Sequence, residues 1–462
     1  MLSNTWSRLT SEVGGRERLG TIALLAAVLG LDMADKGTAS AVADQLKQSF
    51  QIGQTQLGLI FAVVSFVGGI ATLPIGLLVD RISRRRILIA AVSAWVVATV
   101  LSATATSYVY LIVTRIALGV VTAAAWPCVA SLIGDLYPPD QRAWIYGLTD
   151  AGELVGVGVG FFIAGEVSTF AGWRWAFIAM AVPAAILVWL LWRFLAEPER
   201  GSQVGRPAQG DARRSAVRAR VREEKIEPRP GLVLHEDPAS WGLWRVIGYL
   251  LRLPTYRLVI LASGLAYYYF SGLRSFAMVY LSPQYRLSRE LVSALVFALG
   301  VGALVGVTGG GRLSEALLRG GRAKIRITLP SIALFAVVPT LALALWTRNP
   351  WLGIPVLTLA ALLLSAAVPP LDAARLDIIH PRMWGRAEAG RTAIRSIFEG
   401  AAPLLFGAMS GWLGGGREGL RWTFLIMLAP MLAAGALGVR ARRTYLTDVA
   451  TAAASVEATR RK

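Results

Sequence analysis

The sequence predicts an all-α integral membrane protein with twelve transmembrane helices in two pseudo-symmetric six-helix bundles. Hydrophobic residues make up 55% of the chain and charged residues only 16%, a composition outside the range of soluble domains. The apolar residues form continuous runs of about twenty or more, the length at which a helix crosses the roughly 30 Å core of a bilayer. Runs that do not alternate exclude a transmembrane barrel, so the backbone must bond within helices.

Six apolar runs, a polar stretch and six further runs follow one another along the chain. They lie near 19–45, 54–79, 86–105, 108–134, 141–168 and 173–195, and then near 254–283, 289–313, 323–346, 351–379, 386–413 and 419–440. We therefore expect a tail at 1–18, a first bundle at 19–195, a central loop at 196–240, a second bundle at 241–445 and a second tail at 446–462.

A cation-rich hinge joins the second and third runs and reads Gly76-Leu-Leu-Val-Asp80-Arg81-Ile-Ser-Arg84-Arg85-Arg86. A weaker copy, which begins at Gly311 and has Glu315 as its acid, lies half the chain further on. Because Lys and Arg are retained on the cytoplasmic side of a membrane, both hinges are expected to be cytoplasmic turns. Their recurrence predicts an internal duplication.

The distribution of Lys and Arg also predicts the orientation. The hinges, the central loop and the segment after the last run carry most of the cations, which indicates two cytoplasmic termini in a multi-pass protein of the cell (plasma) membrane. The polar first seventeen residues are expected to be a cytoplasmic tail and not a signal peptide. The net charge of +19 is explained by loops that face anionic lipids, so we expect no nucleic-acid partner.

The central loop contains arginines interleaved with Ala and Val, at 213, 214, 218, 220 and 222. One interpretation is a basic helix that lies on anionic headgroups. The other, which we favour, is a solvated linker.

Charged residues inside an apolar helix cost about 2.5–3.5 kcal/mol each at its centre, so each is a candidate for function. The first run contains Asp32, Asp35 and Lys36, whose spacings of three and four place them on one helical face. Two acids that face one cation leave a surplus carboxylate, which can bind and release a proton. The alternative is a static ion pair that fixes the helix in its bundle.

Two further charges lie within the first bundle. Arg115, in the fourth run, could bind an anionic headgroup or hold an acid of the first helix. Glu153 stands among glycines in the fifth run, and we include it with the first-run charges as a candidate for proton coupling.

The second bundle offers candidates for substrate binding. Arg274 is its most isolated cation, and Tyr267 and Tyr268 precede it; these rings could line a cavity or only pack the bundle. Glu399 occupies the eleventh run, and Arg395 lies four residues before it, so the two could form an internal pair.

Glycines recur at every fourth residue in two runs, at 152, 156 and 160 and at 302, 306 and 310. Such strips allow helix backbones to approach closely in lipid. We expect the two strips to meet where the two halves touch and to form a sliding surface.

Features of an enzyme or a metalloprotein are weak. Cys128 is the only cysteine, and the two histidines are His235 in the central loop and His380 at a helix end, so no metal site is expected. A membrane-embedded enzyme would need a convergent nucleophile or metal set. The Gly-x4-Gly-Lys-Ser/Thr motif does not occur, which argues against an ATP-driven pump. We therefore expect neither enzyme activity nor a cofactor.

The hinge, the duplication and the central loop together resemble the major facilitator superfamily of transporters over nearly the whole chain. The family hinge is Gly-x-Leu-x-Asp-Arg-x-Gly-Arg-Arg, and the residues that match it are Gly76, Leu78, Asp80, Arg81, Arg84 and Arg85, with Ser83 in place of the second glycine. The resemblance also places the family's fourth-helix arginine at Arg115. It implies that Asp80 caps a helix end and that the hinge arginines and Glu315 act at a cytoplasmic gate.

Within the superfamily the chain looks most similar to the spinster-like branch of lysophospholipid and sphingolipid transporters. The residues that carry this resemblance are Asp35-Lys36, Gln56-Leu57-Gly58, Pro74, Gly76 and Pro127. That branch tends to have an acid where Thr122 stands here, which shifts weight to Asp32 as the second carboxylate.

The resemblance implies a secondary active transporter that works by alternating access around a midplane site. We expect a monomer among membrane lipids that couples protons to an amphipathic anion such as a lysophospholipid. One alternative is proton-driven efflux of drugs or small organic solutes. A second alternative is a membrane sensor that does not transport.

Overall fold

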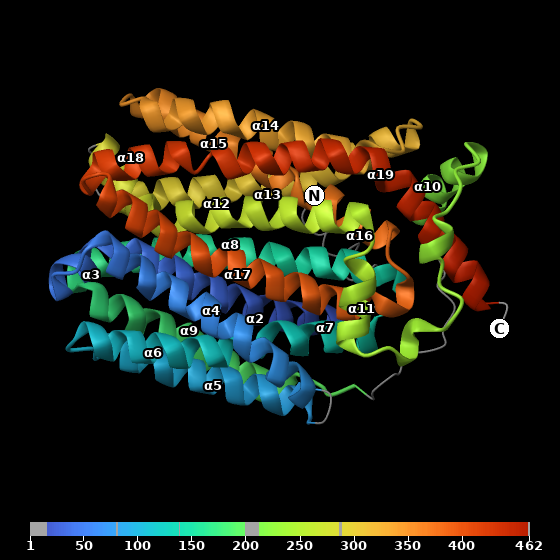
Figure 1. The fold of residues 1–462 in the computed structure, drawn as a ribbon. Helices are drawn as coiled ribbons and strands as arrows, with labels where there is room; N and C mark the ends of the chain where they lie inside the picture. The colour runs from blue at the N-terminus through green and yellow to red at the C-terminus, as the bar shows by residue number, and fades with distance from the viewer. Residues whose placement is uncertain (1–15, 80–81, 138, 199–211, 286–288, 461–462) are drawn as a thin grey trace. The chain divides into compact units, whose positions relative to one another are not determined.

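The computed structural model describes residues 16–79, 82–137, 139–198, 212–285 and 289–460 (Figure 1). Within these ranges the secondary structure consists of helices, and no strand occurs. The expected all-α class is therefore confirmed. Asp80, Arg81 and the first tail to residue 15 lie outside the described residues.

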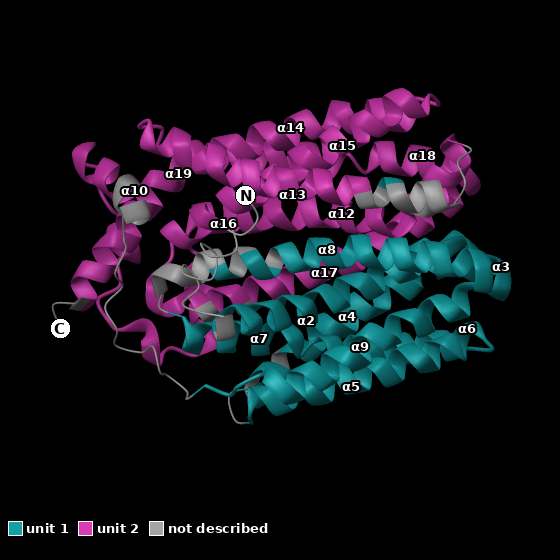
Figure 2. Ribbon diagram, turned by 180° about the vertical axis from the view of Figure 1, so that it is seen from behind, with its two compact units in different colours: residues 1–209, 288–297 teal, residues 210–287, 298–462 magenta. Residues whose placement is uncertain are grey.

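The chain divides into two compact units (Figure 2). Unit 1 contains residues 1–209 and 288–297, and unit 2 contains residues 210–287 and 298–462. The division falls within the central loop, so the second part of that loop belongs to unit 2.

Unit 1 follows the expected apolar runs closely. Its helices are α2 (Arg16–Ala41), α3 (Ala43–Phe50), α4 (Gln54–Val79), α5 (Arg84–Ala103), α6 (Tyr108–Thr122), α7 (Ala125–Leu136), α8 (Pro139–Ala171) and α9 (Trp173–Phe194). Ser83 and Ser107 begin α5 and α6, because each hydroxyl accepts a hydrogen bond from a backbone N–H of the first turn. The fourth run is thus one segment broken between α6 and α7.

Unit 2 adds short helices to the expected set. Its elements are α10 (Ala212–Glu223), η1 (Pro230–Leu232), η2 (Pro238–Ser240), α11 (Leu243–Leu250), α12 (Pro254–Tyr285), α13 (Arg289–Arg319), α14 (Ile325–Trp346), α15 (Pro350–Ala366), α16 (Val368–Asp377), η3 (Pro381–Met383), α17 (Trp384–Trp412), α18 (Gly416–Ile426) and α19 (Ala429–Arg460). The first turns of α13, residues 289–297, are grouped with unit 1.

The number of membrane spans stays a prediction. By length and composition alone, eight helical segments of the described residues can cross a membrane, or nine if α11 and α12 form one bent span. Neither α2 nor α17 is among them, and these two helices carry several of the internal charges. Twelve spans is therefore still our expectation.

The spacing of the helices supports the internal duplication. Helices α5 and α6 begin at residues 84 and 108, and α14 and α15 begin at 325 and 350, a nearly constant shift of 241–242 residues. Two consecutive helices of each unit thus recur with the same register.

The expectation that the two glycine strips meet is wrong. In unit 1 the strip on α8 packs against α2, where a Cβ on Gly156 would collide with the carbonyl oxygen of Gly30. In unit 2 the strip on α13 packs against α15, where a Cβ on Gly306 would collide with the carbonyl oxygen of Leu362. Each strip therefore closes a helix pair inside its own unit, because glycine allows backbones to touch.

The central loop and the second tail differ from expectation. The tail is not separate, since α19 continues without a break to Arg460. Helix α10 lies beside the C-terminal part of α19 (Figure 1) and buries Val217 and Val221 in the core of unit 2. This part of the loop is neither a solvated linker nor an isolated surface helix, because its valines provide an apolar face that packs on α19.

Candidate functional site

A buried ion pair joins α2 to α6. Arg115 Nη1 donates to Asp35 Oδ1 at 3.1 Å and to Asp35 Oδ2 at 2.9 Å. The two side chains are 1% and 4% exposed. The guanidinium carbon lies 4.6 Å from the ring centroid of Phe177 on α9. Of the two uses that the sequence left open for Arg115, holding an acid of the first helix is the one observed.

The hydrogen bonds from Arg115 to Asp35 use only one of the three guanidinium nitrogens, Nη1. Its Nε and Nη2 atoms are buried and have no hydrogen-bond partner among the described residues. A guanidinium has five N–H donors, and buried donors without a partner are costly. The arrangement can therefore accept a further anionic or polar group.

Lys36 pairs with Asp32, at 2.8 Å between Nζ and Oδ2. Asp32 is bound by Lys36 on the same helix, so Asp35 is the acid left over among the charges of α2, and its counter-charge is Arg115 on α6. The sequence left open which acid of the first helix Arg115 holds, since the rotation of α2 decides which acid points to α6.

Glu153 on α8 contacts the fourth segment. Its Oε1 accepts a hydrogen bond from the indole Nε1 of Trp126 on α7 at 2.9 Å, and the residue is 9% exposed. The hydrogen bond fixes this carboxylate at the beginning of α7, directly after the break that separates α7 from α6.

In unit 2, Arg395 and Glu399 form the internal pair that was one of the alternatives, at 2.8 Å between Nε and Oε1. The guanidinium of Arg395 also lies 4.0 Å from the ring centroid of Tyr267 on α12. A cation over an aromatic face is favourable, so Tyr267 has a defined role in positioning this pair.

The rest of the α12 candidates lie in an aromatic environment. Tyr268 donates to Met427 Sδ at 3.2 Å and its ring lies 5.8 Å from that of Phe406. Arg274 is buried, and its guanidinium carbon lies 5.6 Å from the ring of Phe270. These residues combine a cation with apolar rings.

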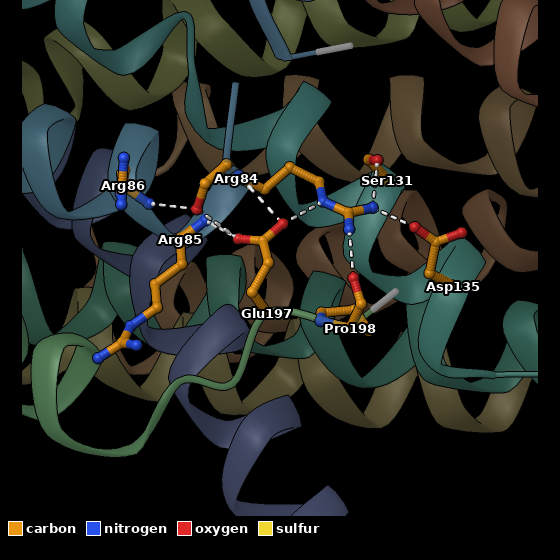
Figure 3. Close-up of polar contacts among 8 residues, drawn as sticks. Arg84, Arg85, Arg86, Ser131, Asp135, Glu197 and Pro198 are labelled. Carbon is orange, nitrogen blue, oxygen red and sulfur yellow. Dashed lines mark hydrogen bonds and ion pairs between the residues drawn. The ribbon is translucent and has the colours of Figure 1, made fainter. Parts of the chain in front are cut away.

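Arg84 of the hinge is the centre of a polar cluster (Figure 3). Its side chain is 1% exposed and forms an ion pair with Asp135 at the end of α7. It also donates to Glu197 Oε1 at 2.8 Å, to Ser131 Oγ at 3.1 Å and to the carbonyl oxygen of Pro198 at 2.8 Å. One guanidinium thus ties α5, α7 and the segment after α9 together.

Glu197 in turn caps α5. Its carboxylate accepts hydrogen bonds from Ser83 Oγ at 2.7 Å, from Arg84 N at 3.2 Å and from Arg85 N at 2.7 Å. Burial alone would raise the pKa of the Glu197 carboxyl, but these donors hold its pKa at about 2. We did not predict this residue, and its position directly before Pro198 was the only signal.

The other hinge candidates are less constrained. Arg85 donates to the carbonyl oxygen of Trp192. Among the described residues, nothing outside its own turn of α4 lies within 4 Å of a Cβ placed on Gly76. Glu315 is half-buried on α13, and the expected cap by Asp80 lies outside the described residues.

Unit 2 contains a counterpart of the Arg84 cluster that sequence reasoning missed. Arg326 at the start of α14 pairs with Asp377 at the end of α16 at 2.5 Å, and Tyr445 donates to the same carboxylate at 2.5 Å. The partners Arg326 and Asp377 are 51 residues apart, as are Arg84 and Asp135. This equal spacing was a signal in the sequence.

The structure adds no metal site. Among the described residues, no group of three or more His, Cys, Asp and Glu side chains is arranged to hold a metal ion. His380 instead accepts a hydrogen bond from Arg382 N at 3.2 Å at the beginning of η3.

Comparisons with known proteins agree with this architecture. The chain is 23% identical over 192 residues to the "Uncharacterized transporter YybO" of Bacillus subtilis (strain 168), a match that covers 42% of this chain and 44% of that protein. It therefore spans less than half the length of this relative.

Two crystal structures of a bacterial homolog to the human lysosomal transporter Spinster share the fold. The inward-facing, occupied structure has a TM-score of 0.72 at 20% identity and covers 92% of this chain and 97% of that one. The inward-facing, unoccupied structure has a TM-score of 0.73 at 21% identity and covers 94% and 98%. The sequence model of the Major Facilitator Superfamily matches residues 24–387. Since this match covers most of the chain, the protein belongs to the Major Facilitator Superfamily.

Proposed function

We propose that the protein is a proton-coupled secondary active transporter that moves an amphipathic anion, such as a lysophospholipid, by alternating access. The observation that carries this proposal is the buried pair of Asp35 and Arg115, whose guanidinium keeps two nitrogen atoms, Nε and Nη2, without a partner among the described residues.

The chemistry of coupling follows from competition for one guanidinium. A proton on Asp35 removes the charge that Arg115 neutralises, and a buried cation without a counter-charge is costly. An anionic headgroup that occupies Arg115 restores the balance. Proton and anion binding therefore favour each other, which is the condition for carrying both in the same direction.

The amphipathic class is supported by the surroundings of the second group of cations. Arg274 and Arg395 each lie against an aromatic ring, of Phe270 and Tyr267 respectively. Arg395 is paired with Glu399, so Arg274 is the cation of this set that we assign to a headgroup, and the rings provide apolar surface for a chain. The Arg84 cluster and its counterpart around Arg326 then serve to hold the helix ends at the hinges while the bundles change position.

The test is uptake into proteoliposomes of a fluorescent lysophospholipid under an imposed pH gradient. We expect uptake to rise with an inward proton gradient and to fall when a protonophore removes it. Asp35→Asn should abolish accumulation but keep exchange of the lipid, because the neutral side chain imitates the protonated acid. Glu418→Gln, an exposed site, is the matched control.

An Asp35→Asn protein that accumulates the lipid as the parent does would overturn the proton role. Protons that move against a cationic drug, with no response to lysophospholipid, would favour the efflux alternative. A ligand that stabilises the purified protein but is not taken up into proteoliposomes under a pH gradient would instead support the sensor alternative.

A further inference from the structure

The segment that follows α10 is bound along the C-terminal part of α19. Leu234 belongs to the same buried cluster of unit 2 as Leu446 and Val449 of α19. Within this segment the short helix η1 bonds Leu232 N to Arg229 O and Val233 N to Pro230 O, and the backbone N–H groups of Arg229 and Leu234 need partners outside it.

Hydroxyl groups on one face of α19 supply those partners. Thr451 Oγ1 accepts a hydrogen bond from Arg229 N at 3.0 Å, and Ser455 Oγ accepts one from Leu234 N at 3.0 Å. Each hydroxyl donates its own proton one turn back, to the carbonyl oxygens of Thr447 and Thr451, at 2.8 Å in both cases. The free lone pairs therefore face the loop.

Asp448 connects this loop to the beginning of α12. Its side chain is 0% exposed; Oδ2 accepts from the backbone N–H of Thr255 at 2.9 Å and Oδ1 from Arg229 Nε at 2.9 Å. Thr255 is in the first turn of α12, where N–H groups have no partner within the helix and a carboxylate is favourable. The 36% exposed Arg229 is the counter-charge that this buried acid needs.

Helix α12 is also tied to α19 by a second contact one turn before Asp448. The hydroxyls of Thr255 and Thr444 lie 2.6 Å apart. The same helix carries Tyr267, Tyr268 and Arg274, the candidates for substrate binding. The contacts at its first turn thus set the register in which those side chains are presented.

We propose that Arg229 of the central loop is a positioning residue for the substrate-binding helix. It neutralises Asp448, so that Asp448 can cap α12 and hold it in register on α19. This role rests on the proposed function, because α12 is assigned there to the substrate. The loop is accordingly part of the binding machinery and not only a connection between the units.

The first readout does not require transport. A Thr255→Cys, Thr444→Cys pair in a Cys128→Ala background should form a disulfide rapidly, and its rate reports the register of α12. Arg229→Ala should slow the reaction about fivefold or more, whereas Arg229→Lys should stay within about twofold. Arg220→Ala is the matched control and should have no effect, because Arg220 and its partners Glu223 and Glu224 are exposed side chains of the same helix, α10.

A double-mutant cycle separates positioning from general loss of structure. Asn at 448 can still accept from Thr255 N but carries no charge, so Arg229→Ala in an Asp448→Asn background should change the rate less than about twofold. For lysophospholipid uptake, Arg229→Ala should raise KM about tenfold with little change in kcat, because binding side chains move while the chemistry of coupling is intact.

The outcomes are distinct. The positioning role would be overturned if the Arg229→Ala protein cross-links at the parent rate. It would also be overturned if Arg229→Ala slows cross-linking as much in the Asp448→Asn background as in the parent. If the parent protein shows no uptake at all, the proposed function fails. The cross-linking result then still decides whether Arg229 sets the register of α12.

Discussion

Replacement of Glu197 by Gln should destabilise the protein through the cluster around Arg84. The carboxylate accepts a charge-assisted hydrogen bond from Arg84 Nε. It also caps α5 by accepting hydrogen bonds from two backbone N–H groups. Gln keeps one carbonyl oxygen but has no charge, so the guanidinium of Arg84, which is 1% exposed, loses one of its two carboxylate partners and keeps Asp135. The variant therefore loses the charge-assisted part of these hydrogen bonds.

The pKa of Glu197 gives the magnitude. A decrease from the ordinary value of 4.5 to about 2 corresponds to about 3 kcal/mol. Solvent screening at the partly exposed carboxylate reduces this to about 1–2 kcal/mol. For a unit of this size the midpoint of thermal unfolding should decrease by about 3–6 °C at pH 7.

The sign of the pH dependence provides a second check. A carboxylate with a depressed folded-state pKa stabilises the protein fully above pH 4.5, and this stabilisation is lost as the pH falls from 4.5 toward about 2. The difference between parent and Glu197→Gln should therefore be present at neutral pH and should shrink as the pH falls through about 3, the middle of that window.

The assay is thermal unfolding of the purified protein in detergent over a series of pH values. Glu223→Gln is the control, because Glu223 and its partner Arg220 are exposed side chains of the same helix, α10. Equal midpoints for parent and Glu197→Gln at pH 7, or a difference that does not change with pH, would refute the role of Glu197 as a charged cap.

Two further predictions concern packing and the second cluster. Gly156→Ala should reduce the yield of folded protein, at a cost in stability of about 3 kcal/mol, because its Cβ would collide with Gly30. Gly20→Ala is the control and should be tolerated, because nothing outside its own turn lies within 4 Å of its Cβ among the described residues. The measurement is the yield of folded protein in size-exclusion chromatography of both variants. Asp377→Asn should lower the free energy of unfolding by about 3–5 kcal/mol, because it leaves Arg326 without its buried counter-charge. Arg326→Met combined with Asp377→Leu should recover most of this stability. Thermal unfolding is the measurement, and an equal loss of stability in both proteins would contradict the prediction.

Local composition was sufficient to predict where the long helices lie. The second run was expected at 54–79 and is α4 (Gln54–Val79), because a long apolar segment in a bilayer has helix as its one way to bond its backbone. The breaks inside the fourth and tenth runs, between α6 and α7 and between α15 and α16, were not predicted, although proline follows each of them, Pro127 in the first turn of α7 and Pro369-Pro370 in that of α16.

The pairing of charges was only partly predictable. The spacing of Asp32 and Lys36 permits their ion pair, which the structure contains. The partner of Asp35 is 80 residues away on α6, and the sequence offered Arg115 only as one of two possibilities. Short-range pairs follow from helical geometry, whereas long-range pairs depend on how each helix is rotated in its bundle.

The sequence by itself determined the class, the family and the positions of nearly all the helices, because apolar length, cation distribution and the hinge motif are local properties of the chain. Only the tertiary structure decided that Glu197 caps α5, that the glycine strips close α8 on α2 and α13 on α15, and that Asp448 joins the central loop to α12. These contacts link segments far apart along the chain. They follow from close packing of backbones and from the need of each buried charge for a partner, which no local pattern specifies.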